Sequence, residues 1–180
     1  MGTAEIACPG LETLHRSSKF DVLAAVTQPD RARGRKLELQ PSAVKQTALK
    51  LGIPVLQPKT LRDQEALDNL ADLEPELIVV IAFGQILPPS VLDLPAHGCV
   101  NVHTSLLPKY RGAAPIQWAI HDGETETGVT LMKMDAGLDT GPIIASKRTV
   151  IGNSNAQQLH DLLANLGAEL LRNSLPGYVS

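Results

Sequence analysis

An asparagine and a histidine, Asn101 and His103, stand one residue apart in the otherwise apolar stretch CVNVH. If this stretch is a strand, both polar side chains point to one face and Val100 and Val102 to the other, because side chains alternate along a strand. A carboxamide and an imidazole on one face can stabilise a developing oxyanion and carry a proton. A hydrogen-bonded structural pair at a strand end is the alternative that this motif alone leaves open.

A third candidate, Asp139, lies in the segment DAGLDTG, whose two glycines and two aspartates indicate a sharply turned loop between strands. Such a loop can project one carboxylate back toward the sheet edge. An aspartate that only caps the turn is the alternative. Between the motifs, Pro108 forces a turn, Gly112 permits close backbone approach and Pro115 begins a helix.

Neither the cysteines nor the histidines are spaced as metal ligands. Cys8 and Cys99 form no CxxC pair, and the five histidines lie far apart with no HExxH or His-x3-His arrangement. We therefore expect no metal, and thiols that stay reduced. No basic leader precedes an apolar run, and no stretch of about 18 apolar residues occurs, so we expect a cytoplasmic protein that does not span a membrane.

Apolar runs alternate with helical patterns along the chain. The strongest predicted strand is LIVVIAF, residues 77–83, which shows no polar alternation and ends at Gly84. We expect further strands at 20–28, 53–57, 99–103, 128–135 and 142–150, and helices at 43–52, 60–73, 113–123 and 155–173. This order predicts an α/β fold: a doubly wound, Rossmann-like, mostly parallel sheet with helices on both faces and ligands beyond the carboxyl ends of its strands.

The length of 180 residues, 43% of them apolar, suits one domain with a buried core. The segment Gly2–Glu5 resembles the turn from a central strand into a helix, yet no strand precedes it, so we expect the first strand of the fold to be missing. After the last predicted helix, PGYVS adds no further element.

The segments NVHTSLLPKYRG and GVTLMKMDAGLDTGPI together resemble, in order and distance, the signature of the folate-dependent formyltransferases. The resemblance implies catalytic roles for Asn101, His103 and Asp139, with 10-formyltetrahydrofolate as the formyl donor and a tetrahedral, oxyanionic intermediate. It also implies that the pterin lies against the end of the strongest strand and the segment after it, with plain strand-end packing as the alternative for these residues, and that the turn after the Asn-x-His motif contacts the donor. The implied contacts are Ile81, Ala82, Phe83, Gly84, Gln85, Ile86, Ser105, Leu106, Leu107 and Pro108.

A basic cluster in the connection from Thr27 to Lys45 bears on the acceptor. Its four positive charges within six residues belong to Arg31, Arg33, Arg35 and Lys36. The net charge of −3 does not favour nucleic-acid binding by the chain as a whole, and a solvated loop is the alternative for such a cluster. The pattern QPDRxxGR…PSxVK resembles the loop that methionyl-tRNA formyltransferases place against tRNA. This implies salt-dependent binding of initiator methionyl-tRNA through residues 29–41.

The resemblance extends from Gly2 to about Leu171. It implies that residues 1–180 form a formyltransferase catalytic domain, without the C-terminal β-barrel domain of full-length relatives, and we expect a monomer. Two alternatives remain: a related domain that formylates an amino-sugar nucleotide, and a truncated copy that binds folate or RNA without catalysis.

Overall fold

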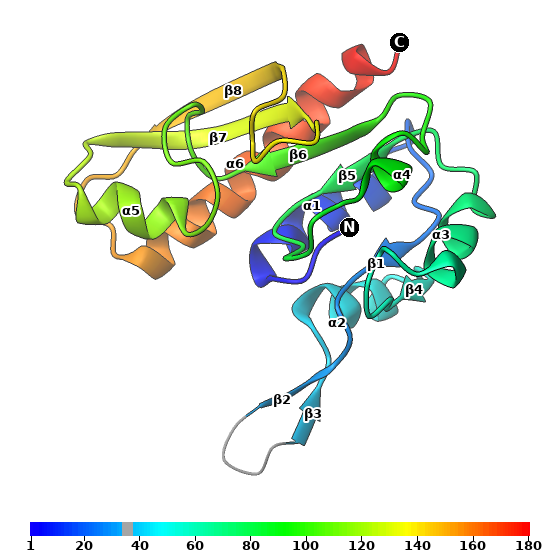
Figure 1. Ribbon diagram of the computed structural model, residues 1–180. Coiled ribbons are helices and arrows are strands. Elements are labelled where there is room, and N and C mark those ends of the chain that lie inside the picture. Colours follow the sequence, from blue (N-terminus) through cyan, green and yellow to red (C-terminus); the bar gives the residue numbers. More distant parts are fainter. Residues whose placement is uncertain (34–37) are drawn as a thin grey trace.

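Helices cover both faces of a twisted sheet in the computed structural model, which describes residues 1–33 and 38–180 (Figure 1). The strands are β1 (Ala25–Val26), β2 (Arg31–Arg33), β3 (Glu38–Gln40), β4 (Val55–Leu56), β5 (Ile78–Val80), β6 (Cys99–His103), β7 (Glu126–Lys133) and β8 (Ile143–Val150). The helices are the 3-10 turn η1 (Glu5–Ala7) and α1 (Cys8–His15), α2 (Ala43–Lys50), α3 (Gln64–Ala71), α4 (Pro89–Leu92), α5 (Pro115–His121) and α6 (Ala156–Tyr178).

The sheet is parallel in its core and antiparallel at one edge. β1 pairs with β4 and β5 pairs with β6 in parallel, whereas β7 runs antiparallel to both β6 and β8. The predicted α/β class with helices on both faces is confirmed, and the last two strands depart from the parallel direction. The connection between them, residues 134–142, is shorter than the dozen or more residues that a parallel crossover requires.

Met1 and Gly2 lie between β1 and β5. Gly2 N donates to Val26 O over 2.9 Å, and Ile81 N donates to Met1 O, also over 2.9 Å. A parallel bridge joins Gly2 to Ile81. Met1 and Gly2 thus occupy two residues of the central position, where we expected a strand to be missing. The strand expected at residues 20–28 is shorter in the structure, where only β1 is paired as a strand.

Apolar side chains on the two faces form two separate clusters. Val100 and Val102 of β6 pack with α1, α2, α5 and α6 on one face. Cys99, with Ile78 and Val80 of β5, packs with α3 and α4 on the other. Because side chains alternate along a strand, Asn101 and His103 share the face of Cys99.

Side chains cap the amino ends of α2 and α6. Ser42 Oγ accepts from Lys45 N over 3.0 Å at the start of α2, and Asn155 and Gln158 form a capping box at the start of α6. The last helix was expected to end near Asn173 but continues to Tyr178, through Pro176. Its final turn carries the fully buried Leu175, and a proline there removes only one hydrogen bond. None of the helices in the described ranges is both long and apolar enough to cross a membrane.

The expected connection at 29–41 contains a two-stranded hairpin. β2 and β3 pair antiparallel, with Arg31 opposite Gln40 and Ala32 opposite Leu39. The hairpin projects away from the rest of the molecule (Figure 1).

Candidate active site

Asn101 and His103 point from the same face of β6, and Asp139 lies beside both. Asn101 Nδ2 donates to Asp139 Oδ1 over 3.3 Å, and His103 Nδ1 lies 3.5 Å from Asp139 Oδ2. The side chains of His103 and Asp139 are only 8% and 12% exposed, so solvent screens their interaction weakly. Two motifs that lie far apart in the sequence therefore form one polar cluster at the end of a buried strand.

The imidazole of His103 is held from its other side by a carbonyl group. His103 Nε2 lies 2.7 Å from Tyr110 O, and Tyr110 adopts a left-handed backbone conformation with φ 55°. Because a carbonyl oxygen only accepts hydrogen bonds, Nε2 must carry the hydrogen of this contact. Nδ1 is then the nitrogen that can gain or lose a proton, and it faces Asp139.

The loop between β7 and β8 presents the Asp139 carboxylate. Asp139 itself has φ 51°, a left-handed conformation that aspartate tolerates better than most residues. Its Oδ2 also accepts from Gly112 N over 2.8 Å. Asp135 Oδ1 braces the loop, because it accepts from Gly137 N over 2.9 Å and from Thr140 Oγ1 over 2.7 Å.

A buried threonine on β7 fixes the segment that follows β6. Thr130 is fully buried and lies opposite His103 in the antiparallel pairing. Its hydroxyl donates to Ser105 O over 2.7 Å and accepts from Leu107 N over 3.1 Å. The turn that leads to Tyr110 and Gly112 is therefore tied to the sheet.

A pocket of about 210 Å³ opens beside the polar cluster. Asn101 and Asp139 form part of its wall, and the remaining lining comes from the end of β5 and the segment after it, from β7 and from the β7–β8 loop. These other lining residues are Val80, Ala82, Phe83, Gly84, Gln85, Ile86, Leu87, Met132, Met134, Asp135, Ala136, Gly137 and Leu138. The lining residues are thus mainly apolar or glycine, and Asn101, Asp135 and Asp139 are among the polar ones.

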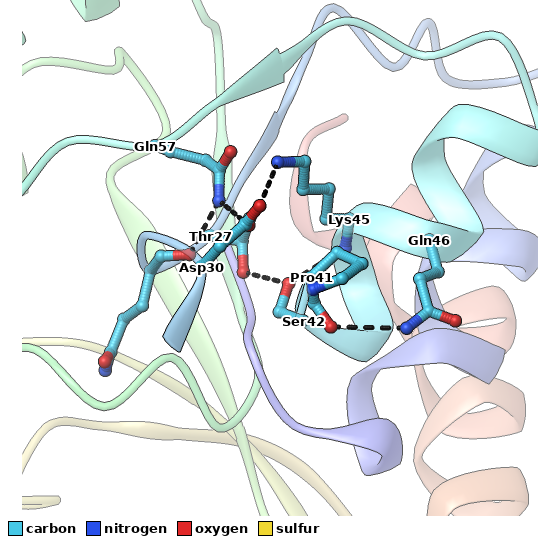
Figure 2. A network of polar contacts seen from close by, with 8 residues as sticks. Thr27, Asp30, Pro41, Ser42, Lys45, Gln46 and Gln57 are labelled. Carbon is cyan, nitrogen blue, oxygen red and sulfur yellow. Dashed lines mark hydrogen bonds and ion pairs between the residues drawn. The ribbon is translucent and has the colours of Figure 1, made fainter. Parts of the chain in front are cut away.

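A polar network anchors the hairpin β2–β3 to the sheet (Figure 2). Asp30 accepts from Lys45 Nζ and from Gln57 Nε2, each over 2.7 Å, and the hydroxyls of Thr27 and Ser42 lie 2.7 Å apart. The hydrogen bond from Lys45, followed by that from Gln57, holds the pKa of Asp30 below its ordinary value. The residues before the hairpin, Thr27 and Asp30, are therefore bonded to the first turn of α2 and to Gln57, which follows β4.

No group of three or more His, Cys, Asp or Glu side chains in the described ranges is arranged to hold a metal ion.

Cys99 is buried, and its Sγ lies 3.4 Å from Val91 O. Burial raises the pKa of the Cys99 thiol to about 12, so it is a core residue rather than a reactive thiolate.

The family of the chain follows from comparison with known sequences. The family model described as "Formyl transferase" matches residues 2–175. The chain belongs to the formyl transferase family. Asn101, His103, Asp139 and the pocket beside them all lie within the matched residues.

Several bacterial members of this family are similar to the chain over nearly its whole length. The protein named methionyl-tRNA formyltransferase from Trichlorobacter lovleyi is 56% identical over 178 residues, which cover 98% of this chain and 56% of that protein. A protein of the same name from Geobacter metallireducens is 54% identical over 176 residues, which cover 97% of this chain and 56% of that protein. The chain therefore spans little more than half the length of these relatives.

Solved formyl transferase structures share the fold. The phosphoribosylglycinamide formyltransferase of Streptococcus pneumoniae superposes with a TM-score of 0.80 at 18% identity, covering 99% of this chain and 96% of that one. Glycinamide ribonucleotide transformylase 1 of Geobacillus kaustophilus gives 0.78 at 23% identity, with the same coverage of both chains. A sugar N-formyltransferase from Shewanella gives 0.62 at 22% identity, covering 74% of this chain and 52% of that one.

The structure brings together only some of the predicted site residues of this formyl transferase. The three predicted catalytic residues meet, and of the predicted donor contacts Ala82, Phe83, Gly84, Gln85 and Ile86 line the adjoining pocket. Ile81 lines a different cavity, and Ser105, Leu106, Leu107 and Pro108 are not among the residues lining the 210 Å³ pocket. Arg31 lies exposed on β2 and donates to Gln28 Oε1, Arg33 ends that strand, and Arg35 and Lys36 lie outside the described residues.

Sequence reasoning missed the groups that position the catalytic candidates. The Tyr110 carbonyl and the Gly112 N–H belong to the backbone, so residue type carries no direct sign of their role. Thr130 could have been singled out, because it is a polar residue in the middle of the otherwise apolar run VTLM. A hydroxyl in such a strand must find a hydrogen-bond partner when it is buried.

Proposed function

We propose that this domain transfers a formyl group from 10-formyltetrahydrofolate to the amino group of methionyl-tRNA. The observation that carries the proposal is the contact of Asn101 and His103 with Asp139 beside a pocket, in a chain that belongs to the formyl transferase family. Relatives that are 53–56% identical and are named methionyl-tRNA formyltransferase support the choice of acceptor.

Formyl transfer to an amine requires stabilisation of negative charge on the formyl oxygen and movement of a proton to the leaving nitrogen. Asn101 would donate a hydrogen bond to that oxygen through its carboxamide. His103 would carry the proton on Nδ1, the nitrogen that faces Asp139. Asp139 would orient the ring and balance its charge, while Tyr110 O and Gly112 N hold this geometry.

The pocket beside Asn101 suits the folate end of the donor. Residues 82–86 line the pocket in a turn with φ 44° at Ala82 and 79° at Gly84. Main-chain groups can match the hydrogen-bonding edge of a pterin, and the apolar side chains of the lining can pack on its ring. Bound there, the donor would place its formyl group near Asn101 and Asp139.

The hairpin β2–β3 would contact the acceptor. Arg31 is exposed on β2, and Arg33 ends that strand. Arginines on a projecting hairpin can neutralise phosphates of the tRNA acceptor stem, which gives affinity that falls with salt. The anchor at Asp30 would fix the direction in which the hairpin leaves the sheet.

The test is a formylation assay with the purified chain, 10-formyltetrahydrofolate and methionine-charged initiator tRNA. We expect formyl-methionine to form, and His103→Ala to lower kcat by on the order of 10²–10⁴. His121→Ala is the matched control, because the His121 side chain is 74% exposed and lies outside the cluster, so its rate should equal that of the unchanged chain.

Parallel reactions with glycinamide ribonucleotide and with an amino-sugar nucleotide distinguish the acceptor. Turnover of either one without turnover of tRNA would overturn the assignment of the acceptor while leaving formyl transfer intact. If no acceptor is formylated by the folded chain, or if His103→Ala reacts as fast as the unchanged chain, the proposed chemistry is wrong.

A further inference from the structure

Tyr110 contacts the catalytic candidates with its main chain and a separate polar group with its side chain. Its carbonyl oxygen lies 2.7 Å from His103 Nε2, and its hydroxyl lies 2.9 Å from both Asp122 Oδ2 and Glu124 Oε1. The two carboxylates belong to the turn between α5 and β7, and neither is among the residues that line the 210 Å³ pocket. We call the side chains of Tyr110, Asp122 and Glu124 the tyrosine brace.

Main-chain hydrogen bonds fix the turn that carries the two carboxylates. Asp122 is the C-cap of α5, and its N–H donates to Trp118 O over 2.9 Å. Glu124 N donates to Ala119 O over 3.0 Å. The acceptors of the Tyr110 hydroxyl are therefore placed by the end of a helix.

The charges of the tyrosine brace suit one donor and two alternative acceptors. The hydrogen bond from His121, followed by that from Tyr110, lowers the pKa of Asp122, and the bond from Lys109 has the same effect on the pKa of Glu124. Burial, followed by the bonds to the two carboxylates, raises the pKa of the Tyr110 hydroxyl. The hydroxyl thus keeps its hydrogen near neutral pH, and because it has only one to donate, either carboxylate alone can accept it.

The backbone of Tyr110 needs contacts that hold it in place. Its φ of 55° is sparsely populated by bulky residues and persists only where the surroundings fix it. The side chain supplies such contacts at both ends, because the ring packs against the apolar cluster that includes Val102 and Ile116, and the hydroxyl is bonded to the brace. The position of the Tyr110 carbonyl therefore depends on its own side chain.

Two acceptors compete for the single ring hydrogen of neutral His103. Tyr110 O lies 2.7 Å from Nε2, whereas Asp139 Oδ2 lies 3.5 Å from Nδ1. With the carbonyl in place, the hydrogen is on Nε2, and Nδ1 keeps a lone pair that can accept a proton. Moving the carbonyl away would leave Asp139 as the nearer acceptor, and the hydrogen would then favour Nδ1. A neutral ring in that second form has no lone pair at the nitrogen that faces Asp139.

We propose that the tyrosine brace sets the tautomer of His103. Tyr110 is a positioning residue: its hydroxyl, held by Asp122 or Glu124, keeps its carbonyl against Nε2 and so keeps Nδ1 able to accept the proton of the reaction. The choice of tautomer follows from the geometry alone. Its consequence for the rate rests on the proposed formyl transfer.

Nitrogen-15 NMR of the full chain measures the tautomer, because ring nitrogens with and without a hydrogen differ in chemical shift. In the unchanged chain, the neutral His103 ring should carry its hydrogen mainly on Nε2. Tyr110→Phe removes only the hydroxyl, and it should shift the ratio of the two neutral forms about tenfold toward Nδ1–H, since a hydrogen bond to a charged group contributes about that much. A pH series identifies the signals of the neutral ring.

Tyr178→Phe is the matched control, because the Tyr178 hydroxyl donates to His97 O over 2.8 Å, outside the brace. It should leave the tautomer unchanged. A second route to the same result combines Asp122→Ala with Glu124→Ala, whose side chains are 43% and 26% exposed, so this double variant tests the brace even if Tyr110→Phe does not fold. Each single alanine variant should shift the tautomer less than the pair, because the other carboxylate still accepts.

Kinetics on the same variants separate the brace from the proposed function. In the formylation assay, kcat of Tyr110→Phe should fall by the same factor as its Nε2–H fraction, with the KM for the donor unchanged. A shifted tautomer in a chain that formylates no acceptor would support the brace and refute the proposed function. An unshifted tautomer in both Tyr110→Phe and the double variant would overturn the brace, as would an equal shift in Tyr178→Phe. Loss of the Nε2–H form without a matching loss of kcat would overturn its role in the reaction.

Discussion

Asn101 and His103 differ in what they can contribute, although they share one face of β6. A carboxamide does not ionise near neutral pH, so Asn101 acts through the two hydrogens of its Nδ2. One of them donates to Asp139 Oδ1 over 3.3 Å, and the other, which has no partner among residues 1–33 and 38–180, is left for a ligand in the adjoining pocket. Asn101 is thus oriented by the same carboxylate that lies beside the imidazole.

Replacing Asn101 by alanine should slow the chemical step rather than weaken binding. We expect kcat for formyl transfer to fall by on the order of 10²–10³, with the KM for the donor nearly unchanged, because the lost hydrogen bond forms mainly in the transition state. Steady-state kinetics measure both constants. Asn165→Ala, at an exposed position of α6, is the matched control and should match the unchanged chain. A rise in KM without a fall in kcat would contradict this role.

The residue types of the cluster were predictable, and their supports were not. Alternation along CVNVH was enough to put Asn101 and His103 on one face, and the glycines around Asp139 indicated a loop that could turn back. The carbonyl of Tyr110 became a partner of His103 only through the path of the segment after β6. That path depends on tertiary contacts such as those of Thr130, which periodicity does not encode.

The hairpin β2–β3 is an element whose placement depends on a few polar contacts at its base. It projects from the sheet, so few apolar contacts hold it, and Asp30 joins it to α2 through Lys45 and to the segment after β4 through Gln57. Sequence analysis expected a connection here. The strand pairing was not predicted, because charged residues and a glycine do not show the alternation of a half-buried strand.

Asp30→Asn should lower stability in a way that depends on pH. Because the folded pKa of Asp30 lies below its ordinary value, its ion pair stabilises the fold above the ordinary pKa of about 3.9. That contribution is lost as the pH falls through the lowered folded value. Thermal unfolding should therefore show the variant less stable at pH near 6, with the difference shrinking below pH of about 4.

Asp72→Asn provides the comparison for Asp30→Asn. Asp72 is exposed at the end of α3, and its side chain makes no ion pair with any described residue. This variant should show no comparable difference at either pH. An Asp30→Asn difference that stays constant from neutral pH down to pH of about 3 would show that the ion pair with Lys45 is not its source.

The sequence predicted the layers of the whole molecule better than the directions of its strands. Unbroken apolar runs identify strands that are covered on both faces, as β5 is, and helical spacing identifies the helices that cover them. Neither pattern indicates whether a strand runs parallel or antiparallel to its neighbour. The short, glycine-containing connection at 134–142 was the available sign that β8 returns antiparallel to β7.

The 23-residue helix α6 connects the amino-terminal part of the fold with the carboxyl-terminal part, because it packs on α1 and also on α5, β7 and β8. Leu163, on its inner face, is 1% exposed, whereas the adjacent Leu162 is 40% exposed. Leu163→Ala should lower the free energy of unfolding by about 2–5 kcal/mol, since it leaves a cavity against the sheet, and Leu162→Ala should change it by about 0.5 kcal/mol or less. Urea unfolding followed by circular dichroism measures both, with equal m-values confirming that the folded and unfolded states are unchanged. Equal losses for the two variants would mean that α6 does not bury the face that carries Leu163.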